Sequence, residues 1–192
     1  MRAALTVLLT MAAAMAASPV AGQDNALRSR LTAVDLKACT QISRHRDGGA
    51  WRCRGLPGFP VYVAAGDLRQ MLSFGEDAQQ RRSATQTLAA FNTIFDGRIR
   101  PTIEWRVAKD AKGREQPYAT IVRFHTSRDG AKGEVLVITK VDARQSCQLA
   151  VVDAAANDNA MAVARNWADR NARIVPCPDK PDVLGKADKS PM

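Results

Sequence analysis

Apolar and polar residues alternate through the middle of the chain, which is the pattern of strands with one buried face. In segment 102–107 every second residue is apolar, and Trp105 shares this face, so Trp105 is expected to be buried. Segments 118–125 and 134–141 are two further strand candidates, and charged turns that contain glycine join all three. This arrangement predicts an antiparallel meander.

The N-terminal part contains shorter strand candidates. Segments 32–40, 50–54 and 59–64 are rich in strand-forming residues and are separated by turn signals. The pattern weakens over 75–100, where a helix over 76–90 and a long surface loop are both open. Long loops of this kind are often functional or mobile.

One helix is predicted near the C-terminus. Between Asn157 and Val175 apolar residues recur at helical spacing, asparagines at the start offer capping oxygens, and Pro176 ends the pattern. Segment 148–152 supplies one more strand before this helix. Residues 178–192 are rich in Pro, Lys, Asp, Gly and Ser, and this composition predicts a disordered tail.

Together these elements predict an α+β fold, with an antiparallel β-sheet of about six to eight strands and one C-terminal helix packed on it. A single domain is expected over 23–177. The chain that follows the first 22 residues is about 170 residues long, which is enough for one core and cramped for two.

Residues 1–22 have the three parts of a secretory signal peptide. Arg2 is followed by an apolar run from Ala3 to Ala17, and the small residues up to Gly22 suit cleavage after that glycine. A retained membrane anchor is disfavoured, because the run is shorter than the roughly 20 apolar residues of a span. No later segment is long and apolar enough to cross a bilayer. We therefore expect a soluble product that is periplasmic or secreted.

The four cysteines are expected to form two disulfides, since an even count in an exported chain is typical of a disulfide framework. Three pairings are open. We favour Cys39 with Cys53, on neighbouring strands, and Cys147 with Cys177, which joins the last strand to the end of the helix. On the chain-entropy view each bridge stabilises the fold by roughly 3 to 4 kcal/mol. Metal binding is disfavoured, since the chain has neither a Cys-x-x-Cys pair nor a Cys/His cluster, and no cofactor is expected.

The chain is basic. Its net charge is +9, and +8 once the segment that contains Arg2 is removed. Such a charge favours anionic neighbours, for example lipid head groups, lipopolysaccharide, acidic glycans or nucleic acid. The basic residues are scattered and acids lie among them, so nucleic acid is not the expected partner, and a solvated cationic surface is the plain alternative.

Four residues are candidates for binding an anionic ligand. Asp67 and Arg69 flank Leu68 directly after a glycine, where Arg69 would meet an anion unless the pair only caps a turn. Arg81 and Arg82 lie in the weakly patterned segment, which we expect to be presented to a partner.

Catalytic signals are sparse. His45 lies beside a turn among charged residues and is expected to be solvated. His125 ends a strand, where it is either a surface residue or a general base with a carboxylate such as Glu104. The chain contains no Gly-x-Ser-x-Gly, no His-Glu-x-x-His and no phosphate-binding glycine loop, which removes the usual support for hydrolase, metalloprotease and nucleotide-dependent activities. No catalytic residue is assigned.

Five blocks of the chain resemble a group of uncharacterised exported proteins of alphaproteobacteria, and the likeness spans most of the chain after the signal segment. The blocks are 51–55, 66–69, 102–106, 117–124 and 147–153. The resemblance implies a location in the cell envelope and implies no activity or site residues.

These expectations favour a non-enzymatic binding or interaction module of the periplasm, which presents the 75–100 segment and a cationic surface to an anionic envelope component or an envelope protein. Two alternatives stay open. One is an envelope hydrolase that uses His125 with an acidic partner, and the other is an inhibitor of lytic enzymes. The inhibitor is disfavoured, because its targets are frequently cationic and would be repelled.

Overall fold

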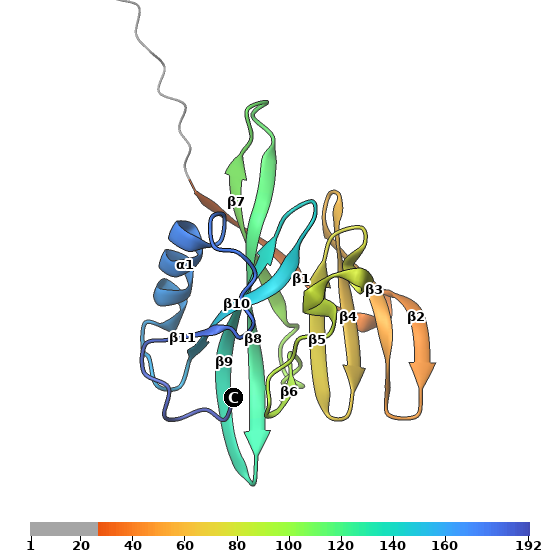
Figure 1. The fold of residues 1–192 in the computed structure, drawn as a ribbon. Helices are drawn as coiled ribbons and strands as arrows, with labels where there is room; N and C mark the ends of the chain where they lie inside the picture. The colour runs from red at the N-terminus through yellow and green to blue at the C-terminus, as the bar shows by residue number, and fades with distance from the viewer. Residues whose placement is uncertain (1–26) are drawn as a thin grey trace, which may run out of the picture.

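Two β-sheets and one α-helix form three stacked layers in the computed structural model, which describes residues 27–192 (Figure 1). The helix α1 (Ala160–Asn171) covers one face of the larger sheet, and the smaller sheet packs on the other. The signal segment expected over 1–22 lies outside the described residues. The α+β class, the mainly antiparallel sheet and the C-terminal helix are confirmed, whereas the division into two sheets was not predicted.

The larger sheet has seven strands. Six follow the order β1, β7, β8, β9, β10, β11, and β6 pairs with the part of β8 that extends beyond β7. All neighbours are antiparallel except β10 and β11. The strands are β1 (Arg28–Ala33), β6 (Phe91–Thr93), β7 (Thr102–Lys109), β8 (Glu115–Arg128), β9 (Ala131–Val141), β10 (Ser146–Asp153) and β11 (Asp182–Leu184).

The smaller sheet is an antiparallel meander of four strands in chain order. Segment 32–40, expected to be one strand, is instead divided between the two sheets by the 3-10 helix η1 (Leu36–Ala38). Asp35 accepts a hydrogen bond from the Lys37 amide and caps this turn, so the chain leaves one sheet and enters the other. The four strands are β2 (Thr40–His45), β3 (Gly48–Leu56), β4 (Phe59–Gly66) and β5 (Arg69–Phe74).

The central strands β7, β8, β9 and β10 of the larger sheet are buried on both faces. Toward the smaller sheet, the fully buried Trp105 packs edge-on against Phe74 with 5.2 Å between ring centroids, which confirms the expected burial of this tryptophan. Toward the helix, Leu136 and Ile138 of β9 meet a surface of small side chains. The side chains that the helix presents to the sheet are alanine methyl groups, so the helix lies close to the sheet. The buried positions of the helix and its C-cap are Ala160, Ala164, Ala168 and Ala172.

The segment between β5 and β7, expected to be a helix or a surface loop, contains β6 and the two 3-10 helices η2 (Ala78–Gln80) and η3 (Arg82–Ala84). The buried hydroxyl of Ser83 lies 2.7 Å from the hydroxyls of both Ser73 on β5 and Ser146 on β10. These hydrogen bonds link the smaller sheet to the larger one. Much of the segment is therefore packed against both sheets rather than standing free.

Residues 178–192, for which the composition predicts disorder, are folded onto the larger sheet and include β11. The carboxylate of the buried Asp153 accepts hydrogen bonds from the Lys189 and Ser190 amides and from the Ser190 hydroxyl. A Cβ atom on Gly133 would lie 2.5 Å from Ser190, so the close approach requires glycine. Leu184 and Met192 pack against the two cores as well, but composition does not reveal this order because it depends on these few specific contacts.

Two disulfides each link a strand to another segment of the chain. Cys39 is bonded to Cys53 and Cys147 to Cys177, which is the pairing that the sequence favours. The first bridge ties the start of β2 to β3, and the second ties β10 to the segment after α1. Disulfides persist in oxidising compartments, so both are consistent with a protein that folds outside the cytoplasm.

Enlarging a buried helix position is expected to disrupt the layer between α1 and the sheet. Ala164 is 0 % exposed, so Ala164→Leu adds methyl groups where no space exists and should lower the free energy of unfolding by about 1 to 3 kcal/mol. Ala162→Leu, on the exposed side of the same helix, is the matched control and should have little effect. Urea unfolding measures both, and equal stabilities would contradict this packing.

Candidate functional site

A groove of about 850 Å³ lies where the β4–β5 turn of the smaller sheet meets β6 and the β8–β9 hairpin of the larger sheet. Pockets of this size commonly hold small organic ligands. We define the groove by six of its lining residues, which combine apolar and charged side chains: Leu68, Arg69, Phe91, His125, Lys132 and Glu134. Its walls come from segments that are far apart in the sequence.

The β4–β5 turn holds Leu68 at the groove in a strained backbone conformation. Asp67 and Leu68 have φ angles of 49° and 58°, in the left-handed region, where a leucine is an outlier. Both adopt it because a two-residue hairpin turn joins Gly66 to Arg69. The Leu68 side chain is nevertheless 71 % exposed, so its burial offsets none of this strain. Strained positions of this kind cluster at ligand sites.

Arg69 is fixed beside the turn by three contacts. Its Nη1 atom lies 2.6 Å from Asp67 Oδ2, its Nη2 atom donates to the Ala89 carbonyl at 3.0 Å, and its guanidinium carbon lies 5.0 Å from the centre of the Phe91 ring. The guanidinium therefore stacks on the aromatic ring that forms a wall of the groove. The predicted pair of Asp67 and Arg69 is an internal ion pair that closes the turn.

His125 lies opposite Glu134 on β9, and not beside Glu104 as the general-base hypothesis supposed. Its Nδ1 atom is 3.4 Å from Glu134 Oε1, while the other carboxylate oxygen of Glu134 accepts a hydrogen bond from Arg123. Among residues 27–192, no hydroxyl or thiol is hydrogen-bonded to His125. Lys132, also on β9, is exposed and forms no ion pair within the same part of the chain, and neither does Asp47 across the groove.

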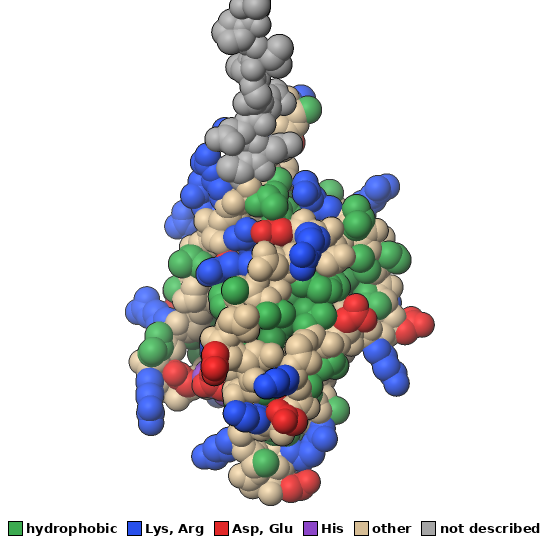
Figure 2. All heavy atoms as spheres, turned by 90° about the vertical axis from the view of Figure 1, so that its left-hand side faces the viewer, with side chains coloured by type: hydrophobic (Ala, Val, Ile, Leu, Met, Phe, Trp, Pro, Cys, Tyr) green, Lys and Arg blue, Asp and Glu red, His purple; other side chains and the backbone are tan. Residues whose placement is uncertain are grey.

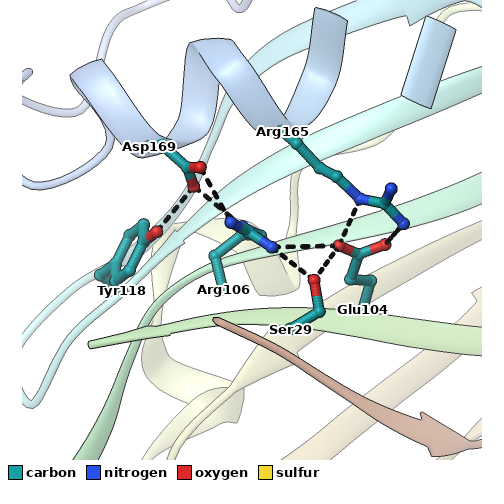
Figure 3. Close-up of polar contacts among 6 residues, drawn as sticks. All are labelled: Ser29, Glu104, Arg106, Tyr118, Arg165 and Asp169. Carbon is teal, nitrogen blue, oxygen red and sulfur yellow. Dashed lines mark hydrogen bonds and ion pairs between the residues drawn. The ribbon is translucent and has the colours of Figure 1, made fainter. Parts of the chain in front are cut away.

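A second cluster of titratable residues lies between β7 and α1 (Figure 3). The guanidinium group of Arg165 donates to both oxygens of Glu104, at 2.7 and 2.8 Å. The guanidinium group of Arg106 donates to both oxygens of Asp169, at 2.8 Å each. Each strand residue is thus paired with a helix residue of opposite charge, and two bidentate contacts fix the position of the helix along the strand.

Two neutral hydroxyl groups complete this cluster (Figure 3). The Tyr118 hydroxyl donates to Asp169 at 2.7 Å, and the Ser29 hydroxyl donates to Glu104 at 2.5 Å. Burial acts to raise the pKa of Glu104, but the hydrogen bonds from Arg165 and Ser29 outweigh it, and the pKa lies below its ordinary value. Burial and the hydrogen bond to Asp169 raise the pKa of Tyr118 far above its ordinary value. The Tyr118 hydroxyl therefore keeps its proton and donates a hydrogen bond to Asp169 at neutral pH.

This cluster is saturated by the chain itself. All four oxygens of the Glu104 and Asp169 carboxylates accept at least one hydrogen bond from a neighbouring side chain. A ligand would have to displace these partners, so we assign the cluster to positioning the helix. Sequence reasoning missed it, although a signal was present: Glu104 and Arg106 share the strand face opposite Trp105, and Arg165 and Asp169 are one helical turn apart.

The structure separates the four predicted binding residues into two places. Asp67 and Arg69 form the turn beside the groove, whereas Arg81 and Arg82 line a different pocket. The groove residues Leu68, Phe91 and Lys132 were not predicted. For Leu68 a signal existed, since a tight hairpin turn usually carries glycine or asparagine at its central positions.

On the face that carries α1, charge is spread rather than concentrated in one tract (Figure 2). On the side of the molecule that carries α1, Lys and Arg side chains project around the whole outline, and Asp and Glu side chains lie among them (Figure 2). Within residues 27–192, no helix is long and apolar enough to cross a membrane. The same residues contain no group of three or more His, Cys, Asp or Glu side chains placed to hold a metal ion.

Comparison of the chain with protein-family models, with curated proteins and with solved structures gave no match. The groove and the helix cluster are therefore interpreted from their own geometry.

The ionised Glu104 is expected to make stability depend on acid pH. Because its pKa is lower in the folded protein than in the unfolded chain, its contribution is complete above the ordinary glutamate pKa and is lost as pH falls through the folded value. Glu104→Gln should lower the free energy of unfolding at pH 7 by about 1 to 3 kcal/mol, because Arg165 loses its carboxylate partner and buried Glu104 loses its charge-assisted hydrogen bonds, while Arg106 keeps Asp169. The difference from wild type should shrink at acid pH.

Urea unfolding from pH 7 to pH 3 checks this expectation. Glu76→Gln is the control, because Glu76 also pairs with an arginine but its side chain is 63 % exposed, and its removal should have a much smaller effect. A Glu104→Gln difference that stays constant over the whole range would contradict the assignment.

Proposed function

We propose that this chain is a non-enzymatic binding module of the cell envelope, and that its groove holds an amphiphilic ligand with an anionic head group, such as a phospholipid. The observation that carries the proposal is the exposed Leu68 in left-handed backbone at the groove. A leucine there costs about 1 to 2 kcal/mol in backbone energy. Because the side chain is exposed, hydrophobic burial within the chain does not offset this cost. A function that needs an apolar side chain at this place accounts for the residue.

The apolar part of the ligand would lie against Leu68 and Phe91. Phe91 is 41 % exposed although it is aromatic, and the guanidinium of Arg69 already covers part of its ring. Covering a leucine side chain fully contributes about 1.5 to 3 kcal/mol, which is enough for a measurable affinity when two such side chains are covered together.

The head group would lie near Lys132. Its ammonium group forms no ion pair within residues 27–192, whereas Arg69 is paired with Asp67 and Glu134 is engaged by Arg123. The net charge, +8 without the signal segment, adds a long-range attraction toward anionic surfaces. Binding should therefore weaken as salt is added.

The envelope location rests on three supports. The first 22 residues have the pattern of a secretory signal, the chain resembles exported proteins, and the two disulfides suit an oxidising compartment. A periplasmic protein of this kind would meet phospholipids directly.

Replacing Leu68 separates binding from stability. Leu68→Asn removes the apolar side chain and supplies a residue that tolerates left-handed backbone, so the melting temperature should stay equal or rise. Affinity for vesicles of phosphatidylcholine and phosphatidylglycerol should fall roughly tenfold, as expected when burial of one leucine is lost. Co-sedimentation at low salt measures the affinity.

Ile99→Asn is the control for this substitution. Ile99 is 76 % exposed and lies outside the groove, so its loss should leave vesicle binding unchanged. The proposal is wrong if Leu68→Asn binds like wild type, if Ile99→Asn weakens binding equally, or if wild type does not bind these vesicles at low salt.

The hydrolase alternative has one observation in its favour, the contact of His125 with Glu134 in the groove. We expect purified protein not to hydrolyse p-nitrophenyl acetate or peptidoglycan above the buffer rate. Turnover that His125→Gln reduces by about 10² to 10⁴, the usual contribution of a general base, would support the enzyme instead.

A further inference from the structure

Arg81 and Arg82 line a second pocket, of about 350 Å³, together with Arg144. The pocket lies between the 3-10 helices η2 and η3 and the turn that joins β9 to β10, and it is separate from the groove because the two share no lining residue. Its lining contains three arginines and a single acid, Asp77. Like charges that line one pocket repel, so an anion between them would be stabilising.

Backbone carbonyl groups hold two of these arginines in place. Arg81 donates through Nη2 to the Ala143 carbonyl at 2.9 Å, and Arg82 donates through Nη2 to the Asp179 carbonyl at 3.2 Å. A carbonyl oxygen orients a guanidinium group without cancelling its charge. The carboxylates nearby are looser, at 3.6 Å from Arg81 for Asp77 and 3.5 Å from Arg82 for Asp179.

Arg144 is the least engaged of the three. Within the part of the chain that the structure describes, its guanidinium group forms no hydrogen bond or ion pair. The neighbouring carboxylate of Asp142 is used by the turn, where its Oδ1 atom accepts the amides of Arg144 and Gln145 at 2.7 and 2.6 Å. The side chain of Arg144 is thus free to bind a ligand at the pocket.

The walls of the pocket are joined covalently and by buried hydrogen bonds. Cys177 lines the pocket and is bonded to Cys147 on β10, next to Ser146, which lines it as well. The Ser146 hydroxyl is hydrogen-bonded to Ser83, which directly follows Arg82. The disulfide and the serine contact therefore hold both sides of the pocket at a fixed separation, which lowers the cost of ordering the arginines around a ligand.

We propose that this pocket binds a small oxoanion of the phosphate monoester class. The guanidinium group presents a planar fork of donors that matches phosphate oxygens. The pocket offers three such groups: Arg144 has no ion pair among residues 27–192, and Arg81 and Arg82 have only loose ones. The ligand would be either soluble phosphate and its esters or the phosphate monoester head group of a lipid. This proposal does not depend on the groove.

Calorimetric titration of the purified, disulfide-bonded protein with inorganic phosphate tests the pocket directly. Arg144→Gln should weaken binding at least about tenfold, because a hydrogen bond to a charged group contributes about 1.5 to 3 kcal/mol. The Arg144 guanidinium group forms no hydrogen bond or ion pair among residues 27–192, so the variant should keep the wild-type melting temperature. Arg46→Gln, another exposed arginine without an ion pair in those residues, is the matched control and should bind like wild type.

Competition distinguishes the two sources of phosphate. Displacement of inorganic phosphate by glycerol 3-phosphate alone assigns the pocket to soluble esters, and displacement by vesicles that contain phosphatidic acid assigns it to a head group. The proposal is overturned if phosphate does not bind at low ionic strength, if Arg144→Gln binds like wild type, or if Arg46→Gln loses as much. Leu68→Asn should leave phosphate binding intact, which keeps this test separate from that of the groove.

Discussion

Burial of the central strands of the larger sheet on both faces is the constraint on which the rest of the structure depends. A sheet covered on one side by a second sheet and on the other by a helix must place apolar residues in both orientations along its central strands. Where β7 breaks this rule, Glu104 and Arg106 point toward α1 and must be paired, because unpaired charge in such a layer is very costly. The helix supplies Arg165 and Asp169 for that purpose.

The same constraint explains where hollows form. Between the sheets, and between the larger sheet and the helix, side chains fill the space, as around Trp105 and beneath the alanines of α1. At the edges of the sheets, turns and short segments meet, and their side chains do not fill all the space between them. The groove and the arginine pocket both lie at such edges, and loops carried by a rigid scaffold are a common place for binding residues.

The two sites differ in which of their charged side chains have partners within the chain. Around the groove, Arg69 and Glu134 have partners within the chain, and the exposed side chains that remain are the apolar Leu68 and Phe91 with Lys132 and Asp47. In the arginine pocket, carbonyl groups hold Arg81 and Arg82, their ion pairs with Asp77 and Asp179 are loose, and Arg144 has no ion pair among residues 27–192. An amphiphile suits the first environment and a compact dianion the second, and neither chemistry requires the other.

The sequence by itself determined the local elements: the strands of the central meander, the C-terminal helix, the burial of Trp105 and the favoured disulfide pairing. These follow from periodicity and spacing, which are properties of neighbouring residues. Only the tertiary structure decided the division into two sheets, the partner of His125, the attachment of residues 178–192 through Asp153, and the composition of both candidate sites. Each of these depends on contacts between segments far apart in the chain, and local pattern carries no information about which distant segments meet.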